Sequence, residues 1–99
     1  MRINDENEID LCDSIITIIY EKETVTEIIS GMEFEKSVFG VAVIYHDGQY
    51  DEPITLATIR NKFPKPHLVI SEHGLSGKIY RYGNHGEYWE EVGKTEGYA

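Results

Sequence analysis

Apolar residues along the chain fall into short β-branched runs separated by polar turns. Residues 14–20 hold four isoleucines around one threonine, and this density of β-branched side chains favours a strand buried on both faces. The same isoleucines, together with Cys12, also fit a helical stripe, so a helix is the alternative here. Residues 38–45 form a further apolar run. They are predicted as another buried strand, with a bulge at Gly40 and a turn at residues 46–48.

The stretch 24–30 is compatible with two kinds of structure. Its valine, threonine and isoleucine residues suggest a strand that pairs with the first one across a short charged turn. Thr24 and Glu27, however, also have the spacing of a helix capping box. We favour the strand.

One short helix is predicted over residues 55–63. Thr55 can act as its N-cap, and three apolar side chains within it share one face. Pro64 follows directly and would end the helix, because proline lacks the N–H that a continuing helix needs.

The last third of the chain predicts a β-meander. Residues 67–72, 78–82 and 88–92 are strand-like and are separated by glycine-rich turns. Residues 93–99 should wrap back or pair at a sheet edge. The fold class that follows is α+β, a small single domain over residues 1–99 with a mainly antiparallel sheet and one short helix packed on it.

Charge restricts the possible partners. Eighteen acidic residues against nine basic ones give a net charge of −9, which argues against direct binding of nucleic acid or an anionic membrane.

The first eight residues, rich in acids, are expected to form a frayed arm. No apolar run is long enough for a membrane span, and the N-terminal residues 1–5 lack a basic region followed by an apolar stretch, so a cytoplasmic protein is expected.

The charges are also segregated along the chain. Residues 1–52 hold 13 acids and three bases, residues 53–82 hold five bases and one acid, and residues 83–99 hold four acids and one base. Either the basic middle segment pairs with its acidic neighbours inside the fold, or the molecule presents opposed electrostatic faces.

No motif for catalysis, metal binding or a cofactor is present. Cys12 is the single cysteine, so there is no disulfide or thiolate zinc cluster, and a buried thiol is expected. The four histidines lack the spacing of metal ligands. Ser71, Glu72 and His73 supply the residue types of a triad, but neighbours on a strand point to opposite faces. An enzyme is therefore not the favoured class, and no cofactor is expected.

The leading hypothesis is a non-enzymatic, acidic protein-binding module. Tyrosine and tryptophan near the C-terminus are typical of protein-binding hot spots, and carboxylates beside them would attract a basic protein surface. One concrete version is an inhibitor encoded by a phage or mobile element, of the anti-CRISPR or anti-restriction type, which blocks the nucleic-acid groove of a host defence enzyme. The predicted partner-binding residues are Asp47, Asp51, Glu52, Glu87, Tyr88, Glu90 and Glu91.

Two other classes stay open. A small enzyme or metabolite-binding domain would use the histidines together with Tyr80, Arg81 and Tyr82 to line a pocket. A structural subunit of a larger assembly would instead pair an exposed sheet edge with copies of itself, which makes a homo-oligomer possible.

Overall fold

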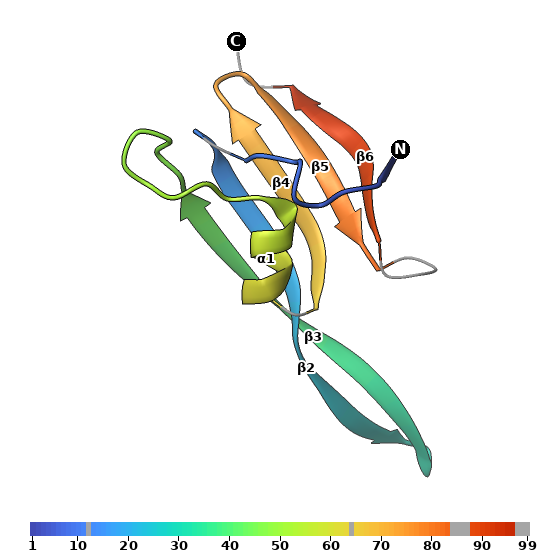
Figure 1. The fold of residues 1–99 in the computed structure, drawn as a ribbon. Helices are drawn as coiled ribbons and strands as arrows, with labels where there is room; N and C mark the ends of the chain where they lie inside the picture. Colours follow the sequence, from blue (N-terminus) through green and yellow to red (C-terminus); the bar gives the residue numbers. More distant parts are fainter. Residues whose placement is uncertain (12, 64, 84–87, 97–99) are drawn as a thin grey trace.

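A computed structural model of the chain describes residues 1–11, 13–63, 65–83 and 88–96. Within these residues, six antiparallel strands form one sheet, and one helix lies across one of its faces (Figure 1). The elements are β1 (Arg2–Ile3), β2 (Ile15–Ile29), β3 (Met32–Tyr45), α1 (Leu56–Lys62), β4 (Pro66–His73), β5 (Ser76–Tyr82) and β6 (Trp89–Glu96). The strand order is β1-β6-β5-β4-β2-β3, so β3 is one edge of the sheet and β1 is the other.

The predicted helix is confirmed, as is its capping residue. The Thr55 hydroxyl accepts the Thr58 N–H and the Thr58 hydroxyl accepts the Thr55 N–H, which is a reciprocal capping box. Leu56 and Ile59 are buried against the sheet. Pro64 lies outside the described residues, and the last helical residue is Lys62.

The core lies on the helix side of the sheet alone. Strand residues point alternately to the two faces, and the buried ones are those that face α1. The fully or nearly fully buried cluster consists of Leu11, Ile16, Ile18, Leu56, Ile59, Val69, Tyr80 and Trp89. The prediction that residues 14–20 are buried on both faces is wrong, because Ile15 on the other face is 46% exposed.

The strand prediction for residues 24–30 is confirmed, but the predicted pairing is wrong. Residues 15–29 form one continuous strand, β2, which pairs with β3 along its whole length. The turn between them is Ser30 and Gly31, with φ of 54° and 79°, as a two-residue hairpin with left-handed central positions requires. The bulge expected at Gly40 is instead in β2, between Glu21 and Glu23.

Gly40 has a different reason to be glycine. A Cβ at this position would lie 2.6 Å from Cζ of Tyr20, whose ring crosses it on the helix side. Tyr20 also packs against Phe63, with ring centroids 4.8 Å apart. The small residue therefore makes room for an aromatic ring that closes the end of the core.

The C-terminal meander β4-β5-β6 is confirmed, and residues 93–96 extend β6 along β5. The N-terminal segment, expected to be frayed, contributes β1, in which Arg2 and Ile3 pair with Glu90 and Trp89. The Glu91 N–H also donates to the Met1 carbonyl at 2.8 Å. The first and last elements of the chain thus lie side by side.

The far half of the β2–β3 hairpin projects from the body of the molecule as an arm (Figure 1), which we define as residues 23–38. The body consists of the remaining described residues. The arm gives the molecule a long dimension of 55 Å against 30 and 25 Å for the other two. In Figure 1, β2 and β3 cross at the base of the arm and exchange sides. A bulge at that point increases the right-handed twist of a two-stranded ribbon.

Candidate protein-binding site

The described carboxylates predicted to bind a partner divide between two places. Asp47, Asp51 and Glu52 lie in the loop that joins β3 to α1, whereas Glu90 and Glu91 lie in β6. The first place gathers further acidic side chains from other elements, and we call it the acidic end. It is formed by exposed Asp13, Asp47, Asp51, Glu52 and Glu72.

Asp13 ties three segments together at the acidic end. Its carboxylate accepts the Gly48 N–H at 2.7 Å, and its carbonyl accepts the His73 Nδ1–H at 2.5 Å. Its own N–H donates to Nδ1 of His46 at 3.2 Å. Its φ of 54° is left-handed, a conformation that aspartate tolerates better than most residues. Gly48 is needed because a Cβ there would lie 2.9 Å from the Asp13 carboxylate.

His46 fixes the beginning and the end of the loop. It is buried, with 6% of its surface exposed. Because Nδ1 accepts the Asp13 N–H, the ring proton is on Nε2, which donates to the Glu52 carbonyl at 2.6 Å. Both ring nitrogens are therefore used, and the histidine serves as a structural bridge with no nitrogen left for a substrate or a metal.

The loop between these anchor points is an acidic turn. Asp47 accepts the Gln49 N–H at 2.9 Å, and Asp51 accepts the Asp47 N–H at 2.8 Å. Such side-chain to backbone bonds stabilise turns. At the tip, Tyr50 is 80% exposed. The loop thus presents a large aromatic ring to solvent on an ordered backbone.

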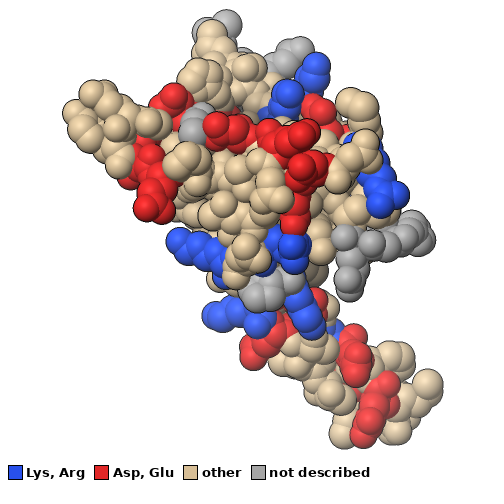
Figure 2. All heavy atoms as spheres, viewed as in Figure 1, with Lys and Arg blue, Asp and Glu red and all other residues tan. Residues whose placement is uncertain are grey.

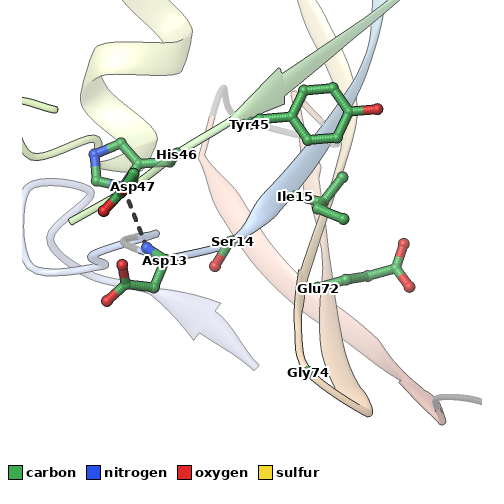
Figure 3. Close-up of a pocket in the computed structure, with 8 residues that line it drawn as sticks. All are labelled: Asp13, Ser14, Ile15, Tyr45, His46, Asp47, Glu72 and Gly74. Carbon is green, nitrogen blue, oxygen red and sulfur yellow. Dashed lines mark hydrogen bonds between the residues drawn. The ribbon is translucent and has the colours of Figure 1, made fainter. Parts of the chain in front are cut away.

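A shallow pocket of about 390 Å³ lies between this loop and the ends of β2 and β4 (Figure 3). Tyr45, Ile15 and Glu72 extend on one side of it, and Asp13, His46 and Asp47 lie on the other. Tyr45 is 75% exposed. The pocket is open, so it suits a protruding side chain of a partner better than an enclosed small molecule.

The electrostatic character of this end is uniform. No lysine or arginine lines the pocket or the neighbouring depression between the loop and α1. Figure 2 shows acidic atoms on the side of the body where the loop lies, and basic atoms gathered where the arm meets the body. A cationic group would therefore be attracted to the acidic end.

The β6 carboxylates differ because they are already paired. Glu90 and Glu91 point to opposite faces of the sheet, and they contact Arg81 at 3.3 Å and Lys78 at 4.0 Å. Tyr88 has the Arg2 guanidinium 4.4 Å from its ring centroid, and Glu87 lies outside the described residues. The structure thus does not bring the predicted residues into one site.

A second group of interacting charges is centred on Glu6 in the N-terminal segment, where the side chains are partly buried. The Glu6 carboxylate accepts from Arg60 Nε at 2.9 Å and from the Trp89 indole N–H at 2.8 Å. The hydrogen bond from Arg60 holds the pKa of Glu6 below its ordinary value of 4.5; burial opposes this shift and the Trp89 bond adds to it. With Lys78 and Arg81, three of the five basic residues of segment 53–82 pair with flanking acids inside the fold.

Of the residues weighed for enzymatic chemistry, Ser71, His73 and Tyr80 line one pocket of about 370 Å³, whereas Arg81 and Tyr82 do not line it. Tyr80 faces the core, where burial and the Glu91 charge raise its pKa, whereas Arg81 points to the opposite face. Ser71 is buried on the helix side, and His73 Nδ1 bonds to a backbone carbonyl. No three metal-ligating side chains come together among the described residues. Cys12 and His85 lie outside these residues.

Sequence reasoning did not single out Asp13, Tyr45 or Tyr50. Nothing local marks them, since Asp13 is 33 residues before His46 and becomes its neighbour only through the pairing of β2 with β3. The turn at residues 46–48 was predicted correctly. The position of Tyr45 and Tyr50 on either side of this turn could have indicated that they are exposed.

Comparison with protein-family models, with curated proteins and with solved structures gives no match for this chain. Within the described part of the chain, no helix combines the length and the apolar character needed to cross a membrane. The function is therefore argued from the geometry of the molecule.

Proposed function

We propose that this chain is a non-enzymatic protein-binding module whose acidic end docks on a basic protein surface. One observation carries the proposal: carboxylates from three separate segments line the pocket beside exposed Tyr45, and no basic side chain among the described residues lines this pocket or the neighbouring one. A second exposed tyrosine, Tyr50, lies in the loop next to them. Tyrosine is a frequent hot-spot residue, and the surrounding charge steers a cationic partner toward it.

The basic partner is proposed to be an enzyme that processes nucleic acid. Such enzymes carry a positively charged groove for phosphates. Carboxylates held on an ordered loop can occupy that groove, as a phage or mobile-element inhibitor of a host defence enzyme would do. The backbone hydrogen bonds of Asp13, Asp47 and Asp51 hold the carboxylates in place, which lowers the entropic cost of binding.

The test begins with affinity capture from nuclease-treated bacterial lysate, with and without added duplex DNA. A partner bound through its nucleic-acid groove is released by the DNA. The association and dissociation rates of the purified partner are then measured at low ionic strength and at about 0.15 M, where exposed charges are strongly screened.

The variants separate steering from anchoring. Asp51→Asn combined with Glu52→Gln should lower the association rate and reduce its salt dependence, because rim charges act on encounter. Tyr50→Ala should raise the dissociation rate and weaken binding by about 2 kcal/mol, or roughly 30-fold. The matched control is Glu33→Gln with Glu35→Gln on the arm, which removes the same charge elsewhere.

A partner that DNA does not displace would refute the nucleic-acid groove as the target. Binding that is unaffected by salt, by the loop variants and by Tyr50→Ala would refute the acidic end as the docking site.

A further inference from the structure

The face of the sheet opposite α1 is covered by no helix or strand among the residues that the structure describes (Figure 1). The pairing register assigns to this open face the odd-numbered residues of β3, whose side chains are Phe39, Val41, Val43 and Tyr45. They are 51, 65, 48 and 75% exposed. A sheet that is apolar on both faces needs a layer on each of them.

The apolar character continues across the neighbouring strands. The partly exposed side chains of Ile19, Leu68, Ile70 and Ile79 follow the β3 residues on the open face. Charged residues of the open face occur only toward its edges, where Arg81 pairs with Glu90. An uncharged centre with a polar rim is the anatomy of a protein interface.

The arm carries a second unpartnered apolar surface. The register places five apolar residues on one side of the arm, Val25, Ile29, Met32, Phe34 and Val38. The same side also holds Glu23 and the ion pair of Glu27 with Lys36, whose charged atoms are 3.8 Å apart. Ile29, Met32 and Phe34 are 55, 61 and 45% exposed. The other side holds Thr24, Thr26, Glu33, Glu35 and Ser37, with Ile28 as its one apolar residue. An isolated two-stranded hairpin is at best marginally stable in water, so this arm needs a surface to lie on.

The β2–β3 hairpin twists at the base of the arm (Figure 1). By register, the apolar side of the arm continues the helix side of the body. β2 and β3 exchange sides where the arm begins (Figure 1), so this side of the arm does not continue straight along the helix side.

We infer that a second copy of this chain covers the open face, with the arm of each copy lying on the body of the other. The length of the arm matches the length of the open face. The seven residue pairs of the arm beyond the bulge span about 23 Å, and the eight residues of β4, a strand of the open face, span about 26 Å. A basic partner does not suit the open face of the body, because the described residues at the centre of that face include no carboxylate. An identical apolar surface does.

The area approaches what a specific dimer needs. An arm about 23 Å long and about 10 Å wide covers roughly 230 Å² of flat surface. Each copy contributes its arm and an equal area of its open face. The pair then buries roughly 900 Å² in flat projection and more as accessible surface, close to the lower bound of about 1,200 Å² for specific interfaces.

The test is the oligomeric state of the full chain, measured by sedimentation equilibrium over a range of concentrations. Val41→Glu on the open face and Phe34→Glu on the arm should each weaken dimerisation at least about 100-fold, because the two-fold contact buries the new charge twice. Both side chains are about half exposed or more, so folding should survive, as circular dichroism will check. Ile28→Glu, on the opposite side of the arm, is the matched control and should leave the dimer intact.

Mixing distinguishes an arm on a face from other dimers. The Val41→Glu chain has an unchanged arm, and the Phe34→Glu chain has an unchanged open face. In a mixed dimer these two surfaces can meet, so the mixture should dimerise at concentrations where neither variant does alone. A monomeric wild-type chain, or a dimer that survives Val41→Glu, would overturn the inference. So would a dimer that Phe34→Glu leaves unchanged. Tyr45 belongs to both the open face and the acidic end, but the test of the acidic end uses Tyr50, Asp51 and Glu52, so the two proposals can fail independently.

Discussion

Replacing Glu6 by alanine should destabilise the fold through the groups that Glu6 satisfies. The carboxylate is 21% exposed, and it links the N-terminal segment to α1 through Arg60 and to β6 through Trp89. Trp89 is 2% exposed, so the variant leaves a buried indole N–H without its acceptor.

The magnitude follows from two contributions. A buried donor left without a partner costs about 1–3 kcal/mol. The ion pair adds only about 0.5–1 kcal/mol, because 40% of the Arg60 side chain is exposed and water screens it. We expect Glu6→Ala to lower the free energy of unfolding by about 2–3 kcal/mol, which shifts the urea midpoint by about 1–2 M.

The assay is urea unfolding at one fixed protein concentration, followed by fluorescence of Trp89, the single tryptophan, and by circular dichroism. Glu8→Ala is the control, since it removes the same charge from the same segment at an exposed position and should change stability by less than about 0.5 kcal/mol. Equal effects of the two variants would refute this account of the group of charges around Glu6.

The same group of charges predicts a pH dependence. The pKa of Glu6 is lower in the folded chain than its ordinary 4.5, so its contribution is present above about 4.5 and is lost as the pH falls through the folded value. Glu6→Gln should flatten the stability profile in this acidic window. An unchanged profile would show that other carboxyls dominate acid unfolding.

Three further results are expected. Burial raises the pKa of Tyr80 above 10.0, so stability should fall as the pH rises past about 10, and Tyr80→Phe should reduce that fall; an ultraviolet titration in which all tyrosines ionise together would contradict this. Gly40→Ala should cost about 1–3 kcal/mol by forcing the Tyr20 ring to move, whereas Gly93→Ala, whose Cβ would meet ordinary contacts, should cost less. His46→Ala should cost about 2–3 kcal/mol in urea unfolding, because two hydrogen bonds are lost at a buried position; a loss under 0.5 kcal/mol would refute its role as a bridge.

Local sequence signals predicted those elements whose cause is local. The helix followed from Thr55 and three apolar positions, and the meander followed from apolar runs between glycine-rich turns. The arm was missed because the Ser30-Gly31 turn signal was not used, and because residues 31–37 hold only two apolar side chains besides the glycine, Met32 and Phe34. A pattern of burial cannot reveal a strand that buries neither face.

The site was harder to predict for a different reason. Whether a carboxylate is free or paired depends on the residue opposite it on the neighbouring strand. The register that sets Glu90 opposite Arg81 cannot be derived from the local sequence of β5 or β6. The loop acids were chosen correctly as exposed, since a turn with aspartate and glycine is a local feature. Their neighbours Asp13 and Glu72 come from distant segments and could not be assigned to the same end.

The order of the strands also sets an order of events during folding. The hairpins β2–β3, β4–β5 and β5–β6 join neighbours in the chain and can form within microseconds. Pairing β1 with β6 instead closes a loop of nearly the whole chain, which carries a larger entropic cost. We expect the N-terminal segment to dock after the rate-limiting barrier. Glu6→Ala should then leave the folding rate almost unchanged and speed unfolding roughly 30-fold. The N-terminal segment would thus dock last during folding and detach first during unfolding.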